Sequence, residues 1–216
     1  MGFLRNRLVV SSRGLLIAGV VVVVLALMAA DTTFLNAAES AEASGPIFTA
    51  EEYAAEKFPE IARLIEENAL DLNSLAADIT ADRDAAGAQF GQSLGAGRYA
   101  FQVKTTAEVT AVEDGWIILD PAGLPPEADL RIPTGPALTG NAVRDATGTI
   151  AFGDFQDQTD YQSVANQFKL IIQRDIVAPI DLDSLVGRTV SVTGAMVSGT
   201  PADAYYIQPV TLEVVE

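Results

Sequence analysis

The chain has 216 residues, a hydrophobic fraction of 49% and a formal net charge of −16. This composition is sufficient for one packed core with additional segments. A surface this acidic repels phosphate backbones, so nucleic acid is not an expected partner. The sequence has no cysteine and no histidine, which excludes disulfides, thiolate chemistry, Cys/His zinc sites and histidine-based triads. We therefore expect no cofactor and no metal.

An unbroken apolar run, residues 14–30, follows a basic segment at residues 1–13. Its length is at the lower limit of the roughly 17–25 residues that span a bilayer as a helix. A cleaved signal peptide is the alternative, but the nearest good cleavage motif, Ala41 to Ala43, lies far behind the run. We expect an uncleaved single-pass anchor in a bacterial inner membrane. Because basic flanks stay in the cytoplasm, the C-terminal domain is expected in the periplasm.

Residues 31–46 are rich in Ala, Glu, Ser and Thr, a composition that favours a flexible tether. Residues 47–90 place apolar side chains at helical spacing, which predicts two or three short amphipathic helices. The first helix is expected to begin at Thr49, which starts a capping-box pattern. Pro59 is expected to break or kink this helix, because proline disfavours helical conformation in the preceding residue.

The remaining residues, 91–216, are predicted to form a domain of mainly β structure. Apolar and polar residues alternate between residues 99 and 110, as in a long half-buried strand. Asp114 and Gly115 form a hairpin signal before a second strand at residues 116–119. A third strand is expected at 129–134 and a short extended piece at 149–152.

A helix beginning at Thr159 and ending before Pro179 is expected to pack on the sheet. Two further strands are predicted at 188–196 and 205–215. Three strands, a helix and two strands are the order of an OB fold. The predicted class is therefore α+β and mainly β: an OB-fold-like small antiparallel barrel with one helix between strands three and four, preceded by short helices and the transmembrane helix. A half-open sandwich is the alternative.

Charged and polar residues concentrate between residues 131 and 161, and the candidates for a ligand- or partner-binding site are Arg131, Asn141, Arg144, Asp145, Asp154 and Tyr161. One interpretation is structural: ion pairs of Arg144 with acidic neighbours hold a long loop against the barrel. The other is a carbohydrate- or small-ligand-binding site, in which polar side chains contact hydroxyls and Tyr161 or Trp116 stacks on the ligand.

A carboxylate-dependent hydrolase is a third hypothesis. It requires two of Asp145, Asp154 and Asp157 to face each other in a pocket. The sequence shows neither a cleft nor a fixed carboxylate separation. We therefore expect a protein that is not an enzyme.

The segment RDATGTIAFGDF, from Arg144 to Phe155, is flanked by RIPTGPALTG and YQSVANQF, and LVGRTVSVTGA lies near the end of the chain. Together these motifs resemble a bacterial family of predicted periplasmic lipoproteins of unknown function, from about Phe58 to the C-terminus. Genes of this family often neighbour sugar ABC-transporter genes. The resemblance implies a periplasmic accessory protein associated with such transporter components, and no established reaction. Because the chain has no cysteine, the apolar run at 14–30 is expected to replace the lipid anchor.

Overall fold

The computed structural model describes residues 20–24, 48–125, 127–198 and 203–215. The chain forms two units, Met1–Ile47 and Phe48–Glu216. In the first unit the described residues 20–24 are helical. The rest of the expected anchor, the basic segment at 1–13 and the expected tether at 31–46 lie outside the described residues. Within the described ranges, no helix has both the length and the apolar character needed to cross a membrane.

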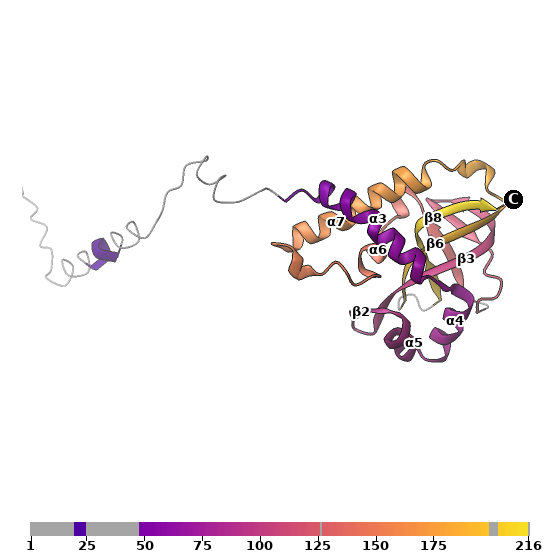
Figure 1. Ribbon diagram of the computed structural model, residues 1–216, viewed down its shortest axis with the longest axis horizontal. Coiled ribbons are helices and arrows are strands. Elements are labelled where there is room, and N and C mark those ends of the chain that lie inside the picture. Colours follow the sequence, from indigo (N-terminus) through magenta and orange to yellow (C-terminus); the bar gives the residue numbers. More distant parts are fainter. Residues whose placement is uncertain (1–19, 25–47, 126, 199–202, 216) are drawn as a thin grey trace, which may run out of the picture. The chain divides into compact units, whose positions relative to one another are not determined.

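The second unit is organised around β3 (Arg98–Glu113), a long strand that is paired on both flanks (Figure 1). β4 (Trp116–Leu119) and β6 (Thr189–Ser198) are its antiparallel neighbours. The strand order is β7-β5-β4-β3-β6-β8. The other strands are β1 (Leu70–Asp71), β2 (Gln92–Gly95), β5 (Asp129–Pro133), β7 (Ala204–Tyr206) and β8 (Gln208–Val215).

The predicted antiparallel barrel differs from the structure in two respects. β5 pairs with β7 in parallel, and so does β1 with β3. The described strands also form an open path rather than a closed ring of paired strands. The two ends of this path, β7 and β8, follow each other in the chain through Ile207, whose N–H donates to the Arg131 carbonyl oxygen at 2.9 Å. Residue alternation predicts which face a side chain takes, but it does not specify the direction of a partner strand.

Glycine is required at two positions of this sheet, Gly115 and Gly194. At the first, the predicted hairpin is confirmed, since Asp114 (φ 52°) and Gly115 (φ 81°) both take the left-handed conformation between β3 and β4. This is the pattern of a type I′ turn. A Cβ on Gly115 would lie 2.9 Å from the Thr134 carbonyl oxygen. A Cβ on Gly194 in β6 would overlap the carbonyl oxygen of Gln208, so β6 and β8 meet where only glycine fits.

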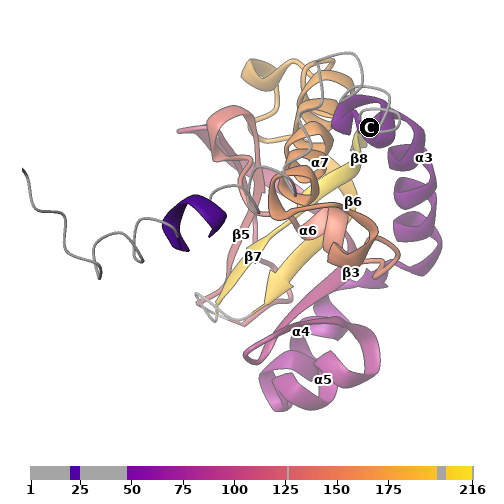
Figure 2. The same ribbon diagram turned by 90° about the vertical axis from the view of Figure 1, so that its left-hand side faces the viewer.

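Helices cover the sheet on two sides (Figures 1 and 2). α3 (Ala50–Asn68) and α7 (Gln158–Ile171) lie side by side and share one hydrophobic core with Ala195 of β6 and Val210 of β8. α4 (Leu72–Ala81) and α5 (Arg83–Phe90) contribute to a second core, in which Phe101 of β3 is fully buried. The expected packing of the helix after residue 158 on the sheet is therefore confirmed.

Pro59 does not interrupt α3, contrary to the prediction. The helix runs without a break from its N-cap Thr49 to Asn68. Phe58 and Ile61, on either side of the proline, are both buried, and the Phe58 ring packs edge-on against Phe168 of α7 at a centroid distance of 5.4 Å. Burial of this apolar face offsets the hydrogen bond that proline cannot donate.

The segment between β5 and α7 also differs from the prediction. The extended piece expected at 149–152 is absent from these described residues, which instead lead into the 3-10 helix η2 (Phe152–Asp154). Two further short helices, η1 (Gly135–Ala137) and α6 (Ala142–Asp145), precede it. Before Pro179 the chain continues from α7 into a π-helix, η3 (Ile172–Val177), and the 3-10 helix η4 (Leu182–Ser184) follows.

The N-cap of α7 is Asp157 rather than Thr159. Its Oδ1 accepts hydrogen bonds from the backbone N–H groups of Thr159, at 2.7 Å, and of Asp160, at 3.0 Å. An aspartate side chain caps a helix at least as well as threonine and also favours the positive end of the helix dipole. This role explains Asp157 without any ligand.

The contact between α3 and α7 predicts a strong stability effect at Phe168, which is 1% exposed. Phe168→Ala is expected to lower the free energy of unfolding by about 3–5 kcal/mol, because it leaves a cavity between both helices and the sheet. Leu170→Ala on the same helix is the matched control, since Leu170 is 60% exposed and its replacement is expected to change stability by less than about 0.5 kcal/mol. Urea unfolding measures both. Equal effects would contradict the packing described here.

Candidate ligand-binding pocket

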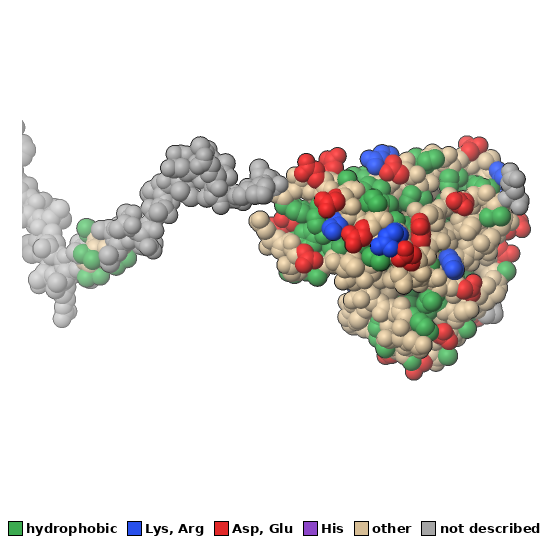
Figure 3. Space-filling view, viewed as in Figure 1, with side chains coloured by type: hydrophobic (Ala, Val, Ile, Leu, Met, Phe, Trp, Pro, Cys, Tyr) green, Lys and Arg blue, Asp and Glu red, His purple; other side chains and the backbone are tan. Residues whose placement is uncertain are grey.

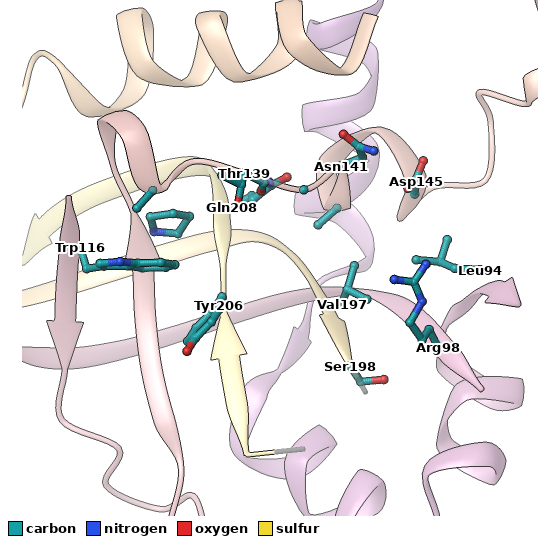
Figure 4. A pocket seen from close by; sticks show the side chains of 14 residues that line it. Leu94, Arg98, Trp116, Thr139, Asn141, Asp145, Val197, Ser198, Tyr206 and Gln208 are labelled. Carbon is teal, nitrogen blue, oxygen red and sulfur yellow. The ribbon is translucent and has the colours of Figure 1, made fainter. Parts of the chain in front are cut away.

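A pocket of about 350 Å3 opens where the ends of several strands meet the segment between β5 and α7 (Figure 4). Its volume is near the lower end of the roughly 300–1,000 Å3 typical of small-molecule sites. β3 to β8 each contribute their first or last residue: Arg98, Trp116, Pro133, Ser198, Tyr206 and Gln208. The segment between β5 and α7 contributes Asn141 and Asp145. The fold therefore gathers residues that are far apart in sequence around one cavity.

One wall of the pocket is aromatic. The rings of Trp116 and Tyr206 lie 4.8 Å apart between centroids. Asp129 fixes the position of this pair. It accepts a hydrogen bond from the Tyr206 hydroxyl at 2.9 Å and forms an ion pair with Arg131 at 2.5 Å. The Arg131 guanidinium in turn lies 5.9 Å from the Trp116 ring centre. Burial and the bond to Asp129 raise the pKa of Tyr206, so its hydroxyl stays protonated at neutral pH.

A second wall is polar and is fixed to the sheet by Gln208, which is buried. Its Oε1 accepts the Val143 backbone N–H at 3.1 Å, and its Nε2 donates to the Thr139 carbonyl oxygen. Asn141 exchanges two side-chain hydrogen bonds with Gln162 of α7, at 3.4 and 3.3 Å. These contacts hold the segment around Asn141 in one position relative to the sheet.

Asp145 also lines this polar wall, and Arg144 supports it from outside the pocket. The Arg144 side chain is 5% exposed and its Nε donates to Asp145 Oδ1 at 2.6 Å. Its guanidinium also stacks 3.6 Å from the centre of the Tyr161 ring, and Nη1 donates to the Tyr161 carbonyl oxygen at 3.2 Å. The Tyr161 hydroxyl donates to the same Oδ1 at 3.3 Å. Burial, and next the charge of Asp145, raise the pKa of Tyr161.

Arg98 and Ser198 form the side of the pocket opposite Trp116 (Figure 4). The Arg98 side chain forms no hydrogen bond and no ion pair with any described residue. Ser198 is 6% exposed, and its Oγ has no hydrogen-bond partner among the described residues. In the pairing of β3 with β6, Tyr99 is opposite Ser198, which places Arg98 next to this serine.

The structure divides the six candidate residues among three places. Asn141 and Asp145 line the pocket, and Arg144 and Tyr161 support Asp145. Arg131 belongs to the aromatic wall and supports Trp116. Asp154 does not line the pocket. It lies at the end of the exposed 3-10 helix η2, where its Oδ2 accepts a hydrogen bond from the Ala151 backbone N–H at 2.9 Å. The six residues are Arg131, Asn141, Arg144, Asp145, Asp154 and Tyr161.

The pocket residues outside the sequence-based candidates include Arg98, Ser198, Tyr206 and Gln208. Each lies at a strand end, and only the pairing of strands brings it to the pocket. For Gln208 a weak signal existed, because it directly precedes Pro209 and ends the regular alternation of the last strand. Arg98 and Ser198 had no local signal of this kind.

The arrangement does not provide a pair of facing carboxylates. Of the three acids considered for hydrolysis, only Asp145 lines the pocket, whereas Asp154 and Asp157 accept backbone N–H groups at turns and helix ends. Within the ranges that the structure describes, no group of three or more acidic side chains is placed to hold a metal ion. The lining residues offer aromatic rings for stacking and polar side chains for hydrogen bonds.

The strand order, the helix between β5 and β6 and the pocket at the strand ends define an α+β protein with an OB-fold-like structure. The crystal structure of an OB-fold protein from Thermotoga maritima is similar, with a TM-score of 0.64 over 78% of this chain and 99% of that chain. At 17% sequence identity, this likeness shows the fold alone. Among curated proteins none matches the chain.

The chain belongs to the family of predicted periplasmic lipoproteins (DUF2291), whose model matches residues 20–213. This confirms the resemblance carried by the segment from Arg144 to Phe155. The match also begins well before Phe58, where the resemblance began. The family description implies a membrane-anchored periplasmic location.

The buried ion pair predicts a large stability effect at Arg144. Arg144→Ala is expected to lower the free energy of unfolding by about 3–5 kcal/mol, because it leaves Asp145 without its partner at a largely buried position. Arg174→Ala is the control: Arg174 also pairs with the next residue, Asp175, at 2.6 Å, but the two side chains are 73% and 48% exposed. No measurable change is expected there. Equal effects in urea unfolding would contradict a structural role for Arg144.

For Ser198, whose hydroxyl has no hydrogen-bond partner among the described residues, truncation is expected not to lower the free energy of unfolding, in contrast to Arg144→Ala. Ser198→Ala is expected to leave the free energy of unfolding unchanged or to raise it by about 1–2 kcal/mol, because a buried unsatisfied polar group is removed. Ser191→Ala, in the same strand and half-buried, controls for the change in strand propensity. A clear loss of stability in Ser198→Ala relative to Ser191→Ala would show that the serine has a structural partner.

Proposed function

We propose that the second unit is a non-enzymatic periplasmic binding module whose pocket takes a small polyhydroxylated ligand, the class to which monosaccharides belong. The observation that carries this proposal is the pairing of two unlike walls around one cavity. The Trp116 and Tyr206 rings form one wall, and Asn141 and Asp145 are part of the other. A sugar presents apolar C–H faces that stack on aromatic rings, and hydroxyls that both donate and accept hydrogen bonds.

Preorganisation of both walls supports this proposal. The aromatic wall is held by the contacts of Asp129 with Tyr206 and Arg131. The polar wall is held by Gln208 and by the contact of Arg144 with Asp145. A site that is already ordered loses less conformational entropy on binding. The buried ion pair therefore supports the ligand site without touching the ligand.

The pocket also favours binding over hydrolysis. Glycoside hydrolysis usually needs two carboxylates about 5–9.5 Å apart across the scissile bond. Asp145 is the one carboxylate among the lining residues, and its Oδ1 is already engaged by Arg144 and Tyr161. We therefore propose that the ligand leaves the site unchanged.

We further propose that this module serves sugar uptake as a membrane-anchored accessory protein. Family membership supports a position at the membrane in the periplasm, and the apolar run at residues 14–30 is proposed as its single-pass anchor in the inner membrane. Sugar ABC-transporter components are the proposed partners, because the resemblance of the sequence implies them. A ligand pocket fits this role better than a contact surface alone, since an accessory protein that senses or delivers a sugar needs a site for it.

The binding proposal is tested with the fluorescence of Trp116, the single tryptophan of the chain, in full-length protein held in a detergent without a sugar headgroup. The panel consists of neutral, acidic and phosphorylated monosaccharides. At least one of them is expected to shift the emission saturably, because Trp116 lines the pocket. Calorimetric titration of Trp116→Ala is expected to show at least about tenfold weaker binding, which corresponds to about 1.4 kcal/mol.

Phe90→Ala is the matched control, because Phe90 is an aromatic side chain that is 36% exposed and does not line the pocket. Thermal melts verify that both variants remain folded. Absence of binding across the whole panel, or equal affinity of the wild type and Trp116→Ala, would refute the proposal.

A further inference from the structure

The charges of the pocket are not balanced. Among the described residues that line it, two are charged, Arg98 and Asp145. Asp145 is already compensated by Arg144 at 2.6 Å. Arg98 has no such partner among the described residues, although the chain as a whole carries a net charge of −16. The pocket therefore presents one uncompensated positive charge in an acidic protein.

Five other basic side chains of this unit form ion pairs, those of Lys57, Arg63, Arg131, Arg144 and Arg174. On the face shown in Figure 3, the blue side chains lie among red ones. Lys57 and Arg63 of α3 form ion pairs with Glu60 and Glu67 of the same helix. Arg98 differs from these five residues, because it lines the pocket and forms no ion pair with any described residue.

A second and independent observation lies next to this arginine. Ser198 is 94% buried, since 6% of it is exposed, and its Oγ has no partner among the described residues. Buried hydroxyls in native structures nearly always have a partner. Ser198 and Arg98 both line the pocket, on the side opposite Trp116 (Figure 4). Both side chains can donate hydrogen bonds, so a ligand group that contacts both must be an acceptor.

We propose that the ligand carries a carboxylate, bound by Arg98 and by the Ser198 hydroxyl, at the end of the pocket opposite Trp116. The ligand class is then a sugar acid, such as a hexuronic acid, with its ring toward the aromatic wall. This inference rests on the proposed function, because it assigns the charged group of the ligand in that same pocket. A guanidinium matches a carboxylate with two parallel N–H···O bonds, and the serine satisfies a remaining lone pair.

The charge balance selects a carboxylate over a phosphate. A phosphate monoester carries about −1.5 to −2 charges near neutral pH, whereas the pocket offers one uncompensated guanidinium. Asp145 lines the same cavity, and the net charge of −16 disfavours a second negative charge. A monoanion neutralises Arg98 and leaves no excess charge in the site.

The test compares glucuronate with glucose, galacturonate with galactose, and glucose 6-phosphate, titrated into the full-length protein at one ionic strength. Each pair differs by a carboxylate in place of a hydroxymethyl group. At least one uronate is expected to bind about tenfold more tightly than its neutral partner, because a charge-assisted hydrogen bond exceeds a neutral one by about this factor. This preference is expected to weaken as salt concentration rises.

Arg98→Gln is expected to remove the preference for the acid while binding of the neutral sugar persists. Arg188→Gln is the matched control: it removes the same charge from an exposed arginine at the opposite end of β6, and it is expected to keep the preference. Ser198→Ala is expected to weaken binding of the uronate and to leave the affinity for the neutral sugar unchanged. Thermal melts verify the fold of each variant.

Each other outcome has a definite meaning. Equal affinity for the acid and the neutral sugar in the wild type would overturn this inference and leave the proposed function standing. Tighter binding of glucose 6-phosphate than of either uronate would overturn the assignment of a carboxylate. An equal loss in Arg98→Gln and Arg188→Gln would show a general charge effect and overturn the site. If no sugar binds, the proposed function fails and this inference fails with it.

Discussion

The pairing of β3 on both flanks is the constraint on which the rest of the second unit depends. One edge of this strand pairs with β6 over ten residue positions, from Tyr99 to Glu108, and its C-terminal part pairs with β4. Its alternation places Ala100 in the core beneath α3 and α7 and Phe101 in the core that contains α4 and α5. Its first residue, Arg98, and the first residue of the next strand, Trp116, then lie on opposite sides of one pocket (Figure 4). The long strand β3 thus contributes to both hydrophobic cores, and its first residue lines the pocket.

Local patterns in the sequence predicted the elements whose formation depends on local physics. The alternation from Tyr99 onward, the Asp114-Gly115 turn and the apolar stripe of α7 all appear in the structure. The expectations that failed involved competition with distant parts of the chain. Pro59 stays within a helix because α7 packs against that helix. Residues 149–152 are irregular and enter η2, where Asp154 accepts a hydrogen bond from the Ala151 N–H. Parallel pairing of β5 with β7 likewise depends on how distant strands meet.

The candidate site could be predicted only in its local part. Asn141, Arg144 and Asp145 were found because polar residues cluster there in sequence, and Asp145 with Arg144 proved to be one supporting unit. Arg131 was found for the same reason, but it supports the aromatic wall, which lies across the pocket. Arg98 and Ser198 are a hundred positions apart, as their numbers show, and only the register of β3 with β6 joins them. No property of either residue in isolation distinguishes it from an ordinary surface or strand residue.

Arg144 and Arg98 illustrate how burial and pairing separate a structural role from the binding role proposed above. Arg144 is buried, stacks on Tyr161 and forms an ion pair with Asp145, so its charge is neutralised within the protein. These contacts offset the cost of removing the guanidinium from water. Arg98 is exposed and forms no ion pair with any described residue, so its charge remains available to a ligand. Ser198 beside it carries the cost of a buried hydroxyl without a bond. In a preorganised binding site, the supporting groups have partners within the protein, whereas the groups that contact the ligand lack hydrogen-bond or charge partners until the ligand binds.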